Sequence, residues 1–125
     1  MKRARSGRPR YLGEMSDLEA TVRTAVELLV RGEPANLEEM TRGKRLSAAQ
    51  LAQAISEYGR TLVPPPLEWW KAVEVTPITN SPGMFHVAAP MWTAEEGRSD
   101  LTLELWVQAS DGGLEIEAVL DLHVL

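Results

Sequence analysis

The sequence has no cysteine among its 125 residues, which excludes disulfide bonds and thiolate metal sites. It has no apolar run near the roughly 20 residues that a membrane-spanning helix needs, and no secretory apolar segment follows its basic start. The glycine motifs of nucleotide-binding loops are also absent, so the sequence does not support a nucleotide cofactor. We expect a cytoplasmic protein with no cofactor and no membrane partner.

The composition is that of an ordinary globular protein. Hydrophobic residues make up 44% and charged residues 25%, close to the average for soluble domains. A chain of 125 residues is long enough to bury a core without a disulfide or a structural metal. We expect a single domain at residues 15–125, preceded by a basic flexible tail at residues 1–14.

Positive charge is concentrated at the N-terminus. Five of the 13 basic residues lie within the first ten positions: Lys2, Arg3, Arg5, Arg8 and Arg10. The other 8 basic residues stand against 18 acidic ones, so residues 11–125 carry a net charge of −10. An acidic body repels phosphate, so nucleic-acid contact is expected only weakly and only through the tail. The tail is also consistent with a solvated end, or with a chain that starts at Met15.

The first helix signal begins at Ser16. Ser16 and Glu19 form a capping box, in which each side chain can bond the other residue's backbone amide. Apolar residues then recur at helical spacing up to the stop signal at Gly32: Leu18, Val22, Ala25, Val26 and Leu29. The sequence therefore predicts an amphipathic helix from Ser16 to Gly32.

Two more helices are expected before the prolines at positions 64–66. A short one is predicted at residues 37–42, with Asn36 as its N-cap. The other begins at Ser47, which forms a second capping box with Gln50, and it ends at Gly59.

Beyond the prolines, the spacing of apolar residues changes from helical to strictly alternating. Six of them alternate near the C-terminus: Leu114, Ile116, Ala118, Leu120, Leu122 and Val124. Four more alternate in the preceding segment: Leu101, Leu103, Leu105 and Val107. Strict alternation predicts two half-buried strands.

Turn residues predict how these strands pair. A two-residue turn at Asp111-Gly112 predicts four apolar pairs: Val107 with Ile116, Leu105 with Ala118, Leu103 with Leu120, and Leu101 with Leu122. A three-residue loop with Gly97 in the left-handed conformation predicts three more: Phe85 with Val107, Val87 with Leu105, and Ala89 with Leu103. Both registers place the apolar residues on one face.

A first strand is expected at residues 71–78, before a turn at residues 80–83. The strand that carries Phe85, Val87 and Ala89 is expected from Met84 to Met91 or Trp92. The four strands then form a meander with one apolar face for the helices to cover. The predicted fold class is α+β, with three N-terminal helices packed on one face of a curved four-stranded antiparallel meander.

The same registers predict a polar set on the other sheet face: His86, Trp92, Asp100, Thr102, Glu104, Trp106, Glu115, Glu117, Asp121 and His123. They place His86 opposite Trp106, and Trp106 opposite Glu117. They also place His123 opposite Asp100, with Asp121 two residues away on the same strand. Two nearby carboxylates would favour the charged form of the His123 imidazole.

Three interpretations of this face compete. Catalysis needs a concave, dry pocket, whereas an open sheet face is wet. A metal site built on Asp100, Asp121 and His123 is one ligand short of a closed tetrahedral set. A protein interface would use Trp92 and Trp106 as anchors, either for a homodimer or for a basic partner. Alternatively, the tail or the pair Trp69-Trp70 covers both tryptophans.

The polar face therefore becomes a candidate interaction face, comprising His86, Trp92, Asp100, Glu104, Trp106, Glu117, Asp121 and His123. No catalytic, cofactor-binding or metal-binding residue is assigned.

Two segments of the sequence resemble an uncharacterised family of small actinobacterial proteins: residues 90–101 (PMWTAEEGRSDL) and 121–125 (DLHVL). The order of elements is similar to the cystatin-like, nuclear-transport-factor-2-like superfamily. That resemblance implies a cone-shaped domain, often dimeric, in a superfamily of isomerases, dehydratases, binding modules and toxin-immunity proteins. Its enzymes hold Asp or His inside the cone, where this sequence is apolar.

We therefore expect a non-catalytic protein-interaction domain, such as one of the immunity type, that binds a protein partner or itself. The alternative is a small-molecule-binding or isomerase/dehydratase-like cone.

Overall fold

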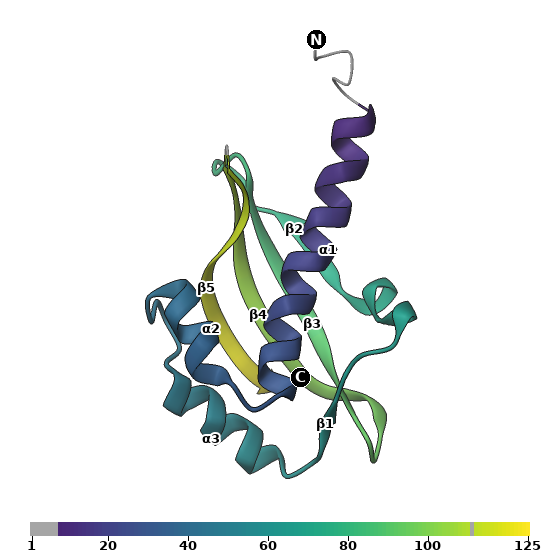
Figure 1. Ribbon diagram of the computed structural model, residues 1–125, viewed down its shortest axis with the longest axis vertical. Helices are drawn as coiled ribbons and strands as arrows, with labels where there is room; N and C mark the ends of the chain where they lie inside the picture. The colour runs from purple at the N-terminus through teal and green to yellow at the C-terminus, as the bar shows by residue number, and fades with distance from the viewer. Residues whose placement is uncertain (1–7, 111) are drawn as a thin grey trace.

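The computed structural model describes the backbone of residues 8–110 and 112–125, and side chains from Asp17 onward (Figure 1). In chain order the elements are α1 (Arg8–Val30), α2 (Pro34–Thr41), α3 (Ala48–Tyr58), β1 (Leu62–Val63), the 3-10 helix η2 (Leu67–Ala72), β2 (Glu74–Pro77), β3 (Met84–Thr93), β4 (Gly97–Ser110) and β5 (Gly113–Val124). The predicted class is confirmed: the fold is α+β, with helices followed by an antiparallel sheet.

Helix α3 forms as its capping signals predict. The Ser47 side chain accepts a hydrogen bond from the Gln50 amide at 3.2 Å, and the Gln50 side chain accepts one from the Ser47 amide at 2.9 Å. Gly59 follows the helix with φ of 74°, a conformation that glycine adopts without strain.

The other two helices begin earlier than the sequence predicts. Helix α1 begins at Arg8, so Ser16 lies in its interior and the predicted cap there is wrong. A proline in the first turn loses no intrahelical hydrogen bond, and Pro9 and Pro34 both take that position. Asn36 is likewise not the cap of α2. Residues 8–14 of the predicted tail are helical, and residues 1–7 lie outside the described part of the chain.

The predicted four-stranded meander is present as β2 to β5, and β1 adds a fifth strand. β1 and β2 both pair with β3, at different positions along the same edge. The first strand of the meander is shorter than the predicted residues 71–78, because η2 extends to Ala72.

The register between β3 and β4 agrees with the prediction. Phe85 pairs with Val107, and the other two predicted pairs, Val87 with Leu105 and Ala89 with Leu103, also form. Gly97 has φ of 77°, the left-handed conformation expected after this hairpin loop.

The register between β4 and β5 agrees only near the turn. Val107 pairs with Ile116 as predicted, but two irregularities follow, and each shifts β5 by one residue. The other three predicted pairs are wrong, and the observed ones are Leu105 with Val119, Leu103 with Leu122, and Leu101 with Val124. The conformation of the turn itself involves Asp111, which lies outside the described residues.

The segment between α2 and α3 accounts for these irregularities. Its Leu46 amide donates a hydrogen bond to the Val119 carbonyl at 3.1 Å, on the edge of β5. Its Lys44 ammonium lies 2.6 Å from the Glu117 carboxylate. Both contacts hold β5 where the two bulges occur, and a bulge is a common way to alter the edge of a sheet.

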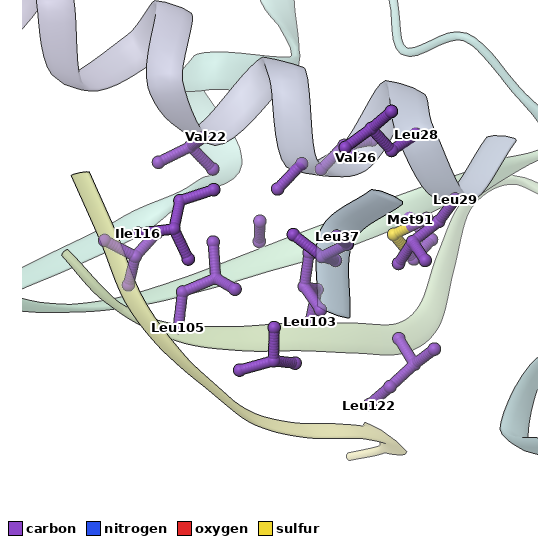
Figure 2. Packing of buried hydrophobic residues seen from close by; sticks show 14 of the residues in the cluster. Val22, Val26, Leu28, Leu29, Leu37, Met91, Leu103, Leu105, Ile116 and Leu122 are labelled. Carbon is purple, nitrogen blue, oxygen red and sulfur yellow. The ribbon is translucent and has the colours of Figure 1, made fainter. Parts of the chain in front are cut away.

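Helix α1 crosses one face of the sheet, and the core lies between them (Figure 1). Figure 2 shows Val22, Val26 and Leu29 of α1 opposite the strand residues, with Leu37 of α2 beside them. The strand side of this core is apolar, and Val87, Leu103, Leu105 and Val107 are fully buried. No helix in the described residues is long and apolar enough to cross a membrane.

Candidate functional site

The sheet face opposite α1 carries the candidate site, and we call it the open face. Alternation along the strands places Val87 and Leu105 in the core and their neighbours His86, Glu104 and Trp106 on the open face. The pairing of His86 with Trp106 is as predicted. The open face comprises Glu74, Thr76, His86, Thr102, Glu104, Trp106, Asp121 and His123.

Three side chains of the open face form a hydrogen-bonded cluster. The Nε2 atom of His86 lies 2.8 Å from one carboxylate oxygen of Glu104. The Nε2 atom of His123 bonds the other oxygen. The cluster therefore joins β3, β4 and β5 through positions that are diagonal neighbours on the sheet. All three side chains are partly buried, with Glu104 24% exposed.

The Glu104 carboxylate is held in its charged form. Burial raises its pKa, but hydrogen bonds from His123 and His86 lower it more, so that the pKa lies below the usual value. An ionised carboxylate can only accept hydrogen bonds. Both imidazoles must therefore carry a hydrogen on Nε2, which fixes the tautomer of each ring when it is neutral.

The predicted pairing of His123 with Asp100 is wrong because of the two bulges in β5. His123 lies opposite Thr102 instead, and its carboxylate partner is Glu104. Asp121 lies opposite Glu104 and is exposed. Asp100 is also exposed, and its backbone carbonyl accepts a hydrogen bond from the amide of Leu125.

The predicted pairing of Trp106 with Glu117 is also wrong. The bulge places Trp106 opposite Ala118, and Glu117 forms an ion pair with Lys44 instead. Trp106 itself is half-buried between His86 and Ala118.

The predicted tryptophan pair does not form one patch. Trp92 lies six positions along β3 from His86, the partner of Trp106, so roughly 20 Å of strand separates the two positions. Trp92 packs against the core. Trp69 is fully buried, donates Nε1–H to the Pro90 carbonyl at 3.1 Å, and has the guanidinium of Arg23 4.7 Å above its ring.

The histidine cluster does not form a metal centre. In the described residues, no group of three or more His, Asp or Glu side chains is placed to hold a metal ion. Each imidazole instead bonds a different oxygen of Glu104, so the cluster is a hydrogen-bonded unit. An open groove of about 350 Å³ beside α3 is lined by His123, but its lining does not include His86 or Glu104.

Three features of the site were not predicted from the sequence. The first, the contact between His86 and Glu104, could have been predicted from the β3–β4 register, because the two residues are diagonal neighbours there. The contact of His123 with Glu104 depends on the bulges, for which the sequence has no signal. The position of Glu74 on the open face depends on the register between β2 and β3, which the sequence does not predict.

One family model, described as Domain of unknown function (DUF7668), matches residues 26–125. The chain belongs to this family. The DUF7668 match begins within α1 and includes the whole sheet, so the histidine cluster lies inside it. No curated protein and no solved structure matches the chain. Membership in a family without an assigned function agrees with the first resemblance, whereas the cystatin-like, nuclear-transport-factor-2-like fold stays a prediction.

Proposed function

We propose that the chain is a non-catalytic protein-interaction domain that binds its partner through the open face. The observation that carries this proposal is the position of Trp106. It is half-buried, it stands among polar and charged side chains, and it lies on the face opposite α1. A tryptophan surrounded by a polar rim is the usual anchor of a protein interface.

The histidine cluster supports a binding role more than a catalytic one. Both oxygens of Glu104 already accept hydrogen bonds, so the carboxylate has no idle oxygen to act as a base. The bonds also fix the side chains beside Trp106, which lowers the entropy cost of binding to them. A rigid surface around an aromatic anchor suits recognition, including that of the toxin-immunity type.

The alternative, a small-molecule-binding or isomerase/dehydratase-like cone, needs polar groups between α1 and the sheet. In the described residues that space is filled by a cluster of buried apolar side chains. Leu103 and Leu105, at the centre of β4, are fully buried there. A ligand bound between α1 and β4 would favour this alternative over the open face.

A photo-crosslinking amino acid at position 76 tests the proposal and leaves Trp106 in place, because the exposed Thr76 lies opposite His86 on the open face. The matched control carries the same group at Ala49, which is exposed on α3. We expect position 76, and not position 49, to crosslink one defined protein in extracts of the source cells. We also expect Glu104→Gln to reduce that crosslink. Identical products from both positions, or none from position 76, would contradict the proposal.

Self-association through the open face is the second form of this proposal. A homodimer would crosslink to a second copy of the chain from position 76. Sedimentation velocity would then show a dimer for the wild type and a monomer for Trp106→Glu, since a buried unpaired carboxylate is costly. If the wild type and the variant are both monomers, the partner is a different protein.

A further inference from the structure

We propose that the segment recognised by the open face is cationic, a stretch of polypeptide that places an arginine over Trp106. This inference rests on the proposed function and adds the chemistry of the partner. It starts from a row of side chains that crosses the sheet. Glu74 pairs with Ala88, Ala88 with Glu104, and Glu104 with Asp121. Three carboxylates therefore lie in one row across four strands.

Trp106 lies in the adjacent row. His86 pairs with Thr76 on one side and Trp106 on the other, and these positions are two residues along the strands from Ala88 and Glu104. Two residues of strand span roughly 7 Å, which is within reach of one arginine side chain. A guanidinium over the indole would therefore lie beside the carboxylate row.

The strands supply almost no positive charge of their own. β2 to β5 contain six acidic residues and one arginine, Arg98. Arg98 pairs with Trp92, far along β4 from Trp106. Lys44 approaches from the α2–α3 segment, but it pairs with Glu117. The open face thus has a negative field that favours cations and repels phosphate.

The chain already contains the contact that we propose for the partner. The guanidinium of Arg23 lies 4.7 Å from the centre of the Trp69 ring, within the range of a cation–π interaction. Arginine suits such a site better than lysine, because its planar guanidinium stacks on indole and can still bond carboxylates at its edges. Trp106 offers the ring, and the exposed Asp121 offers the carboxylate, while Glu104, whose oxygens bond the histidines, contributes its negative charge.

The proposed occupant is an arginine-bearing segment of a foreign protein. A second copy of the chain is the competing occupant, because residues 2–10 supply five basic residues, and Figure 1 shows the N-terminal end of α1 projecting past the sheet. Self-association that weakens in salt and that an added arginine peptide competes away would show that the second copy binds instead, and would overturn the foreign partner.

Fluorescence anisotropy tests the inference with a labelled nine-residue peptide of alternating arginine and serine. The control peptide has citrulline in place of arginine, which keeps the shape and removes the charge. At about pH 7.5 and low salt, with EDTA present, we expect the arginine peptide to bind the full chain at least about tenfold more tightly. Equal binding of the two peptides would overturn the inference.

Variants of the protein show which surface binds the arginine peptide. We expect Glu104→Gln and Trp106→Ala each to weaken binding of the arginine peptide about tenfold. Trp106→Phe should weaken this binding less, because phenylalanine retains part of the cation–π attraction. Glu39→Gln, the same charge change on an exposed residue of α2, should have no effect. Equal losses from Glu39→Gln and Glu104→Gln would show unspecific attraction to an acidic protein and overturn the inference.

The crosslinking result separates this inference from the proposed function. If position 76 crosslinks a partner but neither the variants nor the peptides show a preference for arginine, the interaction domain stands and the cationic partner does not.

Discussion

Glu104 accepts a hydrogen bond from His86 with one carboxylate oxygen and from His123 with the other, so a single side chain of β4 joins both neighbouring strands. The same residue lies at the centre of the acidic row and two positions from Trp106 on its own strand. Stability, pH dependence and recognition at the open face therefore depend on one carboxylate.

Replacing this carboxylate should destabilise the fold. In Glu104→Gln the amide oxygen can accept from one imidazole, but the NH2 group opposes the other donor. We expect a loss of about 1–2 kcal/mol in the free energy of unfolding, measured by urea denaturation. Glu39→Gln on α2 is the matched control and should change stability by less than about 0.5 kcal/mol.

The contribution of Glu104 to the stability of the fold should disappear in acid. Hydrogen bonds lower its pKa in the folded state below the ordinary value of 4.5, so its stabilisation is present above that pH. It is lost as the pH falls through the folded pKa, because both states are then protonated. We expect the stability difference between wild type and Glu104→Gln to shrink when denaturation is followed from pH 6 downward through that range. A difference that persists in strong acid would contradict this assignment.

The four tryptophans should separate into core and surface types. Trp69→Ala removes a fully buried ring, its hydrogen bond to Pro90 and its contact with Arg23, and should cost about 3–5 kcal/mol. Trp106→Ala removes a half-buried ring and should cost about 1 kcal/mol. Thermal and urea unfolding of the two variants would check this. Equal losses would mean that Trp106 is a structural residue.

The N-cap of α3 offers a test of the helical half. Ser47→Ala removes a capping bond to the Gln50 amide and should cost about 1 kcal/mol. Ser56→Ala lies on the exposed surface of the same helix and should be neutral or slightly stabilising, since alanine has the higher helix propensity. Urea denaturation followed by circular dichroism measures both. A loss at Ser56 as large as that at Ser47 would argue against the cap.

Local signals explain the parts of the fold that the sequence predicts. The capping box at Ser47 and the left-handed Gly97 each depend on a few adjacent residues. The β3–β4 register follows from a short loop and an alternating pattern, and it already places His86 near Glu104. Such features need no knowledge of the rest of the chain.

The parts that the sequence does not predict depend on distant contacts. The bulges in β5 lie where Lys44 and Leu46 bond Glu117 and Val119, residues more than 70 positions away. Alternation of the apolar residues continues through the bulges, so it could not reveal them. The position of His123 beside Glu104 is a consequence of that docking, which is why the candidate site was predicted only in part.

The most direct test of the account observes the indole N–H signals of the four tryptophans by ¹H–¹⁵N NMR while the arginine peptide is added. Single Trp→Phe variants assign the signals. We predict that the Trp106 signal moves with the peptide concentration, that the buried Trp69 signal stays in place, and that Glu104→Gln suppresses the shift. A peptide that saturates the protein without moving the Trp106 signal would contradict the claim that the open face is the binding surface.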